Sequence, residues 1–252
     1  MPPPRIESRS PRSSGPSGEP AAAPLPVLGD VFGRPLRNLR VSVTDRCNLR
    51  CGYCMPEQEY VWLPHDRLLR FEELRDLVAA FAGLGVDRVR LTGGEPLLRR
   101  DLHVLVGLLR GVAGIREVSL TTNGLLLAEQ AAAVRAVGLD GVTGSPDTLD
   151  AERFRRMTRR DGLERVLAGI DAARAAGFAG TKLDCVLLRG ENDAEVEDLL
   201  DFARGRDLEL RFIEYMDVGG ATHWSARQVV PRAELLERLG ASRGPVQPYT
   251  DA

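Results

Sequence analysis

Residues 39–54 read LRVSVTDRCNLRCGYC and join an extended stretch directly to three closely spaced cysteines. The first six residues alternate in polarity and are rich in β-branched side chains, which is typical of a β-strand. Cys47, Cys51 and Cys54 follow with C-x3-C-x2-C spacing, and the remaining cysteine, Cys185, lies far downstream. Because α/β proteins bind ligands beyond the carboxyl ends of their parallel strands, this order predicts a thiolate site at such an end.

Three thiolates in one short loop favour an iron–sulfur cluster over a closed zinc site. Thiolates bind zinc and iron–sulfur clusters alike, but a structural zinc ion requires four ligands. The three histidines, at positions 65, 103 and 223, are not close to the cysteines in the sequence. Three cysteines suit a cubane cluster with one iron left open for a small molecule. An incomplete zinc site and a redox pair are the alternatives.

Residues 44–56, TDRCNLRCGYCMP, resemble the cluster loop of the radical S-adenosylmethionine (SAM) enzymes. More narrowly, they and residues 32–40 resemble the GTP 3′,8-cyclase family of molybdenum-cofactor biosynthesis. The resemblance implies that Cys47, Cys51 and Cys54 bind three irons of a 4Fe–4S cluster while SAM chelates the fourth. Reductive cleavage of SAM would yield a 5′-deoxyadenosyl radical that abstracts hydrogen from the substrate, and in the family closes GTP to (8S)-3′,8-cyclo-7,8-dihydroguanosine 5′-triphosphate.

The same resemblance implies four SAM contacts, at Tyr53, Gly94, Ser145 and Met216. Tyr53 would lie against the cluster and SAM, and Gly94, in the sequence TGGEP, would meet the SAM amino group. Ser145 ends a predicted strand, and Met216 follows another and would lie beside the adenine. The ordinary alternatives are core packing for Tyr53 and Met216, and a plain strand-to-helix turn for Gly94.

Four further residues, Arg40, Arg90, Thr121 and Lys182, occupy positions that bind GTP in the cyclase family. The three cations lie in predicted strands, and if they face inward they place positive charge inside a barrel. Buried unpaired cations are costly, so this arrangement implies an anionic ligand such as a triphosphate. Lys182 is the one lysine among 34 basic residues, which favours a site that needs a compact charge. Exposed strand faces are the alternative.

The remaining sequence predicts six strand–helix units with short connections, and therefore a parallel α/β sheet. Strands are expected at residues 39–44, 86–91, 117–121, 139–145, 181–188 and 208–215, with helical apolar spacing between them. This pattern fits both an incomplete barrel and a doubly wound sheet. The resemblance implies the incomplete, six-unit β/α barrel of the radical SAM type.

Three residues depart from the family pattern within the predicted sheet. Gly144 and Pro146 stand where the family has apolar residues, and Asp184 stands where asparagine is usual. Glycine weakens a strand and proline removes a backbone donor from its hydrogen-bond ladder. We therefore expect loosened pairing around the fourth strand, close to Ser145.

The predicted organisation has three parts. Residues 1–28 are rich in Pro, Ser, Ala and Arg and predict a disordered tail. Residues 29–218 would form the partial barrel, and residues 219–252 a truncated C-terminal extension. The family carries a second 4Fe–4S cluster on three C-terminal cysteines that this sequence lacks. The alternatives to a cyclase are a radical SAM enzyme with another substrate and an inactive iron–sulfur domain.

Composition describes an ordinary globular protein, with 43% hydrophobic and 28% charged residues. The net charge of −2 gives no reason to expect nucleic acid or a membrane surface as partner, and no apolar run approaches the length of a membrane span. Four cysteines, three of them clustered, fit a reducing cytoplasm better than a disulfide framework. The resemblance adds an electron donor such as flavodoxin or ferredoxin, and leaves a homodimer open.

Overall fold

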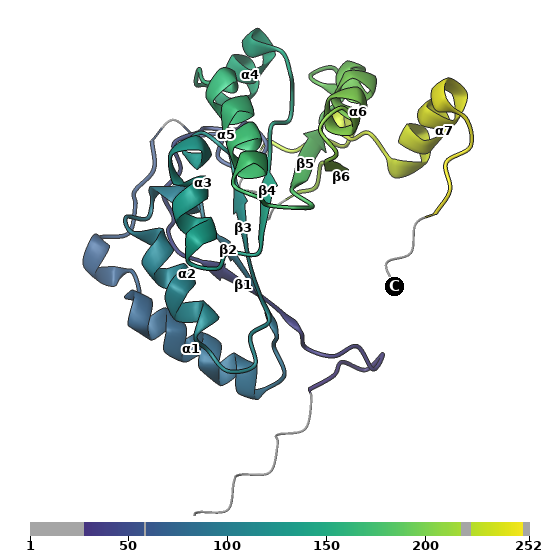
Figure 1. Cartoon of the computed structure of the whole chain (residues 1–252). Helices are drawn as coiled ribbons and strands as arrows, with labels where there is room; N and C mark the ends of the chain where they lie inside the picture. Colours follow the sequence, from purple (N-terminus) through teal and green to yellow (C-terminus); the bar gives the residue numbers. More distant parts are fainter. Residues whose placement is uncertain (1–27, 58, 218–222, 249–252) are drawn as a thin grey trace, which may run out of the picture.

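The computed structural model describes residues 28–57, 59–217 and 223–248, and they contain one six-stranded parallel sheet (Figure 1). The predicted tail lies outside these residues apart from Leu28, and the predicted extension lies partly outside them. The strands are β1 (Asn38–Ser42), β2 (Arg88–Thr92), β3 (Glu117–Thr122), β4 (Gly141–Gly144), β5 (Lys182–Leu187) and β6 (Glu209–Glu214). The six predicted strands are therefore all present, and every bound lies within two residues of its prediction.

The strand order decides between the two folds that the sequence pattern allows. Neighbouring strands follow one another as β1-β2-β3-β4-β5-β6, and every pair is parallel. A doubly wound sheet reverses its strand order at a switch point, whereas a β/α barrel keeps adding strands in one direction. The observed order is that of an incomplete six-unit barrel.

Within the described part of the chain, seven α-helices cover the convex face and the edges of this sheet. They are α1 (Phe71–Gly83), α2 (Leu102–Arg110), α3 (Leu127–Ala136), α4 (Ala151–Thr158), α5 (Leu163–Ala175), α6 (Val196–Arg204) and α7 (Arg232–Arg243). Figure 1 shows α1, α2, α3 and α5 as one layer over the sheet. Among the described residues, none of these helices has the length and apolar character that crossing a membrane requires.

Helix α4 was not predicted, because its apolar signal is short. Its eight residues include only two large buried side chains, Phe154 and Met157. The carboxylate of Asp150 caps its first turn by accepting a hydrogen bond from the Arg153 amide at 2.7 Å. This local cap and the two buried side chains are enough to hold the helix against the barrel.

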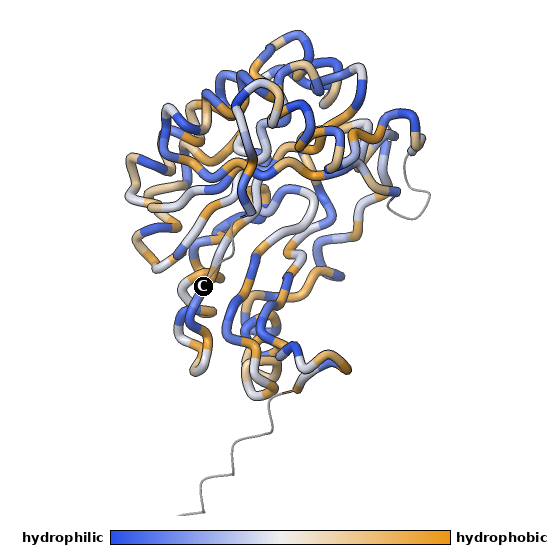
Figure 2. Tube along the Cα trace, turned by 90° about the vertical axis from the view of Figure 1, so that its right-hand side faces the viewer, coloured by the Kyte–Doolittle hydropathy of each residue, from blue (hydrophilic) through white to orange (hydrophobic). Residues whose placement is uncertain are grey.

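Apolar and polar residues alternate along the strands, and hydropathy along the chain is coloured in Figure 2. Side chains such as Val89, Leu91, Val118 and Leu120 point to the helix layer and belong to the largest core cluster. The intervening positions carry charge or hydroxyl groups on the opposite, concave face. Parallel sheets are usually apolar on both faces, so a polar concave face indicates a surface kept for ligand.

The β4 strand is the weak part of the sheet, as Gly144 and Pro146 predicted. It is shorter than the predicted 139–145, and Pro146 lies beyond its end. Only two residue pairs connect β4 to β5, whereas six connect β5 to β6. A Cβ atom built on Gly144 would lie 3.6 Å from Ile170 and Leu183, which is ordinary contact. The glycine is therefore not required for packing, and its presence weakens the strand.

Candidate cluster and ligand site

The cysteine loop follows β1 at the carboxyl edge of the sheet, as predicted. Cys51 is buried, Cys47 is half-buried and Cys54 is exposed. The amides of Cys54 and Met55 both donate to the Cys51 carbonyl, at 3.1 and 2.8 Å, so the second and third cysteines share one tight turn. This turn brings the two thiols into contact, and that contact lowers the pKa of Cys54 and raises that of Cys51.

The surroundings of Cys47 suit a thiolate ligand. Its sulfur accepts hydrogen bonds from the Leu49 amide at 3.4 Å and from the Asn123 side chain at 3.8 Å. Hydrogen bonds of this kind to ligand sulfurs tune iron–sulfur clusters. No three ligand side chains among the described residues stand in the arrangement that one metal ion needs.

The TGGEP loop after β2 packs directly on the cysteine loop. Gly94 and Glu95 donate backbone hydrogen bonds to the carbonyls of Thr44 and Arg46, each at 2.8 Å. A Cβ atom on Gly94 would lie 2.3 Å from the Arg46 oxygen, and one on Gly93 would lie 2.4 Å from the Thr44 oxygen. The sequence predicted glycines that let backbone approach a ligand. The structure adds a second reason, because the space beside them is filled by the cysteine loop.

Glu95 is a buried carboxylate that sequence reasoning did not single out. It accepts hydrogen bonds from the Leu97 amide at 2.9 Å, the Thr122 hydroxyl at 2.8 Å and the Asn123 amide at 2.7 Å. Burial raises the pKa of this carboxyl group. Asn123 in turn bonds the side chain of Asn48 at 2.7 Å and approaches Cys47. One buried acid therefore fixes the ends of β2 and β3 against the cysteine loop.

Tyr53 lies between the cysteine loop and the end of β4. Its ring packs against the core cluster that contains Cys51, and its hydroxyl donates to the carboxylate of Asp147. Asp147 also accepts from the Val186 amide at 2.9 Å, and burial raises its pKa to about 6. Nothing in the sequence pattern marked Asp147, because its two partners come from segments far from it in the sequence.

The other two predicted SAM contacts lie at neighbouring strand ends. Ser145 follows β4, is half-buried and precedes Asp147 by two residues. Met216 follows β6 and is 61% exposed, so the alternative of a core methionine is wrong. Both residues are therefore on the carboxyl edge that carries the cysteine loop.

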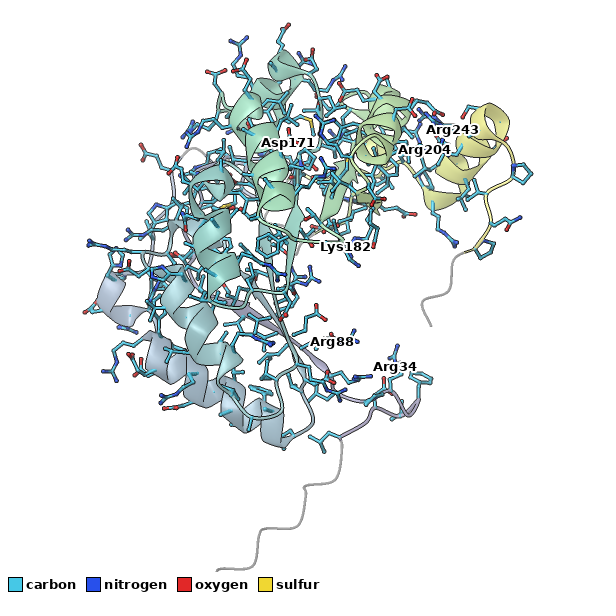
Figure 3. The ribbon with its side chains drawn as sticks, viewed as in Figure 1. Arg34, Arg88, Asp171, Lys182, Arg204 and Arg243 are labelled. Atoms are coloured by element: carbon cyan, nitrogen blue, oxygen red, sulfur yellow. The ribbon has the colours of Figure 1, made fainter. Side chains whose placement is uncertain are left out.

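The concave face holds a cavity of about 370 Å³ that brings together three of the four predicted substrate residues. Arg40, Arg90 and Thr121 line it, and they are joined by Arg88, Glu117, Asp184 and Arg211 from the same face. Lys182 does not line this cavity. Its pairing with Thr143 and Glu209 in the sheet places it on the concave face, away from α1 to α3 (Figure 3).

The cations of the concave face differ in how they are paired. Arg90 donates to the hydroxyls of Thr143 at 3.0 Å and Thr121 at 3.3 Å. Lys182 is 3.0 Å from a Glu209 oxygen, and Arg211 is 3.0 Å from an Asp184 oxygen.

Two cations of this face keep their charge available. Arg40 makes no ion pair with any of the described residues. Arg90 bonds only neutral hydroxyls there. Both guanidinium groups could therefore bind an anion in this cavity.

Arg211 and Asp184 were absent from the predicted substrate set, although both line the cavity. Burial raises the pKa of Asp184, while the neighbouring Arg211 opposes that shift. Alternation along β6 was visible in the sequence, and it placed Arg211 on the same face as Glu209. What the sequence did not show is that β5 and β6 bring these two side chains together.

Comparison with known proteins agrees with this geometry. Residues 41–203 match the model of the Radical SAM superfamily. The chain is 48% identical over 223 residues to GTP 3′,8-cyclase 3 of Mycobacterium tuberculosis (strain CDC 1551 / Oshkosh), covering 87% of this chain and 59% of the relative. It is 51% identical over 226 residues to the GTP 3′,8-cyclase of Acidothermus cellulolyticus, covering 88% and 62%. The chain thus spans less than two thirds of the length of these relatives.

Solved structures show the same fold at much lower identity. SuiB of Streptococcus suis bound to S-adenosylmethionine superposes with a TM-score of 0.66 at 18% identity, covering 81% of this chain and 46% of that one. The maturase HydG superposes with a TM-score of 0.63 at 16% identity, covering 82% and 49%. With a family model that matches most of its barrel, the chain belongs to the radical SAM superfamily.

Proposed function

We propose that this chain binds one 4Fe–4S cluster through Cys47, Cys51 and Cys54, and binds SAM beside it. The observation that carries the proposal is the cysteine loop itself, whose Cys47 sulfur accepts two N–H donors and whose backbone is fixed by the TGGEP loop. When bound, the cluster supplies the electron that cleaves SAM to a 5′-deoxyadenosyl radical. The catalytic unit is the partial barrel of residues 29–218, working in a reducing cytoplasm with flavodoxin or ferredoxin as electron donor.

The protein's own contribution is to hold SAM in register with the substrate. Gly94, Ser145 and Met216 lie on the edge of the sheet that carries the cysteine loop, so they would contact SAM bound beside the cluster. Tyr53 is fixed by its hydrogen bond to Asp147, so its ring forms a rigid wall beside the cluster loop. A rigid wall of this kind orients reactants and excludes water.

We propose GTP as the substrate, converted to the 3′,8-cyclised nucleotide as in the cyclases that the chain resembles. Support comes from the cavity on the concave face, where Arg40 and Arg90 are available for a triphosphate and Thr121 supplies a hydroxyl. Lys182 would complete the set once it leaves Glu209. The planar guanidinium group of arginine donates paired hydrogen bonds to phosphate oxygens. A triphosphate bound in the cavity would neutralise the positive charge of its arginines.

A second candidate is a radical SAM enzyme whose substrate carries less negative charge than GTP. The observation that favours it is the pairing of Arg211 with Asp184 and of Lys182 with Glu209. These two carboxylates occupy cations that a triphosphate needs. The relatives also extend well beyond the matched length, so the cyclisation of GTP by this chain is a separate question from the cleavage of SAM.

The test is an anaerobic reaction that measures both steps. The protein is reconstituted with iron and sulfide and given dithionite, SAM and GTP, and 5′-deoxyadenosine and cyclised nucleotide are quantified by mass spectrometry. Both products are expected, and neither is expected from Cys51→Ser. Deoxyadenosine without a GTP product would support the second candidate. A fully loaded cluster that leaves SAM intact would overturn both.

A further inference from the structure

Helix α4 is attached directly to the loop that carries the cysteines. The amides of Arg50 and Gly52 donate to the carbonyls of Thr158 and Met157, at 2.9 and 3.1 Å. The Arg159 guanidinium donates to the carbonyl of Pro56, two residues beyond Cys54. The end of α4 and the cysteine loop are therefore one continuous surface at the carboxyl edge of the barrel.

This surface is rich in arginine. Four exposed arginines stand within six residues at the end of α4, at positions 155, 156, 159 and 160. Arg156 and Arg159 line a hollow of about 230 Å³ together with Gly52 and Tyr53 of the cysteine loop.

The nearby acids do not cancel this charge. Glu152 lies 3.5 Å from Arg156 and is itself 71% exposed, and Glu191 lines the same hollow. Asp161 follows the last of the four arginines. Arg153 is paired with Glu195 and adds nothing to the exposed charge. A local excess of positive charge remains, on a chain whose net charge is −2.

The position of this surface beside the cluster loop indicates a role in electron delivery. We infer that the four α4 arginines form the docking surface for an acidic one-electron carrier protein of the flavodoxin or ferredoxin class. The inference rests on the proposed cluster. The hollow that Arg156 and Arg159 line includes Gly52 and Tyr53, which stand between Cys51 and Cys54, so a carrier docked there lies beside the cluster loop.

The transfer itself requires one electron and no bond making. The reduced carrier is oxidised by one electron, and the cluster is reduced by one. Encounters of this kind use small interfaces and are steered by opposite charge, so a few exposed arginines are sufficient. Such binding weakens steeply as ionic strength rises, because solvent-exposed charges are screened within about 8 Å at physiological salt.

The test compares two double variants with the same loss of charge. Arg155→Gln with Arg156→Gln removes half of the docking surface while keeping the buried side chains of α4. Arg174→Gln with Arg204→Gln is the control, since these arginines lie in the last turns of α5 and α6, which lead into the amino ends of β5 and β6. Reconstituted protein is titrated with a recombinant bacterial flavodoxin by calorimetry at low and high salt. Deoxyadenosine formation is then measured with reduced flavodoxin and, separately, with dithionite.

We expect the α4 variant to bind flavodoxin about tenfold more weakly at low salt and to lose flavodoxin-driven turnover in proportion. Its dithionite-driven turnover should equal that of the wild type, and the control should behave as wild type throughout. Equal flavodoxin affinity in the wild type and both variants would overturn the docking surface. Failure with dithionite in the wild type would instead overturn the proposed function, because a small reductant needs no docking surface.

Discussion

The carboxyl edge and the concave face of the same sheet differ in how their polar groups are paired. At the edge, the polar groups that support the cysteine loop are bonded within the protein: Glu95 accepts three hydrogen bonds and Asp147 accepts two. On the face, Arg40 has no charged partner among the described residues, and Arg90 bonds only neutral hydroxyls.

The polar groups of the edge are positioned by the protein itself, whereas the cations of the face would be paired by a bound ligand. A buried group that is fully hydrogen-bonded is held in one geometry, whereas an unpaired cation near solvent can bind an anion. Substitutions at the edge should therefore change stability and cluster loading. Substitutions on the face should change ligand affinity and leave folding nearly intact.

The largest effect is expected where the edge is most tightly packed. In Gly94→Ala the new methyl group would lie 2.3 Å from the Arg46 oxygen, so the backbone of the cysteine loop has to move. We expect a loss of about 3 kcal/mol or more in unfolding free energy and a clear fall in iron bound per chain. Urea unfolding and iron analysis after reconstitution measure both.

Gly52→Ala is the matched control for this change, because a Cβ there meets nothing within 4 Å. It should load iron like the wild type. If Gly94→Ala also keeps full stability and iron content, the cysteine loop is not fixed by the TGGEP loop.

Asp147 should make the unfolding free energy of the protein depend on pH. Its pKa is about 6 when folded, against an ordinary value of 3.8, so the folded state holds a proton that the unfolded state has already lost between these values. Stability should therefore fall as pH rises from about 4 to 6, by about 2 to 3 kcal/mol from this group. Asp147→Asn cannot ionise and tolerates the φ of 50°, so it should remove that fall, although its NH2 group replaces one of the two acceptor oxygens.

Urea unfolding of Asp147→Asn and wild type at pH 4, 5, 6 and 7 isolates this contribution, because the difference between them cancels the other titrating groups. The wild type should lose stability relative to the variant across this range. If the unfolding free energies of the two proteins change with pH in the same way, folding does not raise the pKa of Asp147.

Glu95 is the next test of the edge. Glu95→Gln replaces one acceptor oxygen by an NH2 group that has to face an N–H or O–H donor, because all three partners of this carboxylate donate. We expect a loss of about 2 kcal/mol in unfolding free energy, the typical cost of a buried polar group without its partner. Glu117→Gln, on the exposed rim of the cavity, should cost much less. Equal unfolding midpoints for the two variants would contradict the buried role.

The sequence predicted the concave face better than the edge, for a physical reason. The family resemblance named Arg40, Arg90 and Thr121, and strand alternation, with its period of two, puts them on one side, where they share a cavity. The edge depends on contacts between segments far apart in sequence, such as Tyr53 with Asp147. No local pattern encodes these, and the resemblance marked Tyr53 without its partner.

Dependence on contacts distant in sequence also explains why helix α4 and the role of Arg211 were not predicted. Helix α4 has only Phe154 and Met157 as large buried side chains, too few for a periodic signal, and it is held by the loop it contacts. Arg211 was placed in a strand but not in the site, because its role depends on Asp184 in the neighbouring strand. Cysteine spacing, by contrast, is a local signal, and it led directly to the edge.

On the face, Asp184→Asn tests whether the carboxylates limit anion binding. The substitution removes the negative charge 3.0 Å from Arg211 and leaves Glu209, at 3.6 Å, as its remaining acidic partner among the described residues. We expect GTP to bind several-fold more tightly, about 1 kcal/mol, with little change in unfolding free energy. Asp171→Asn is the control, because Asp171 pairs with Arg206 outside the cavity. Unchanged or weaker GTP binding in Asp184→Asn would show that Arg211 does not face the triphosphate.

The smallest effect is expected at Gly144, where the edge and the face meet at the end of β4. An alanine Cβ there would lie 3.6 Å from the side chains of Ile170 and Leu183, so it adds contact without a clash. Gly144→Ala should raise the unfolding free energy by about 0.5 to 1 kcal/mol, because alanine loses less backbone entropy on folding. Gly169→Ala should destabilise instead, since its Cβ would lie 2.5 Å from the Gly124 oxygen. If Gly144→Ala destabilises as well, the short β4 pairing is a requirement of the site and not a tolerated weakness.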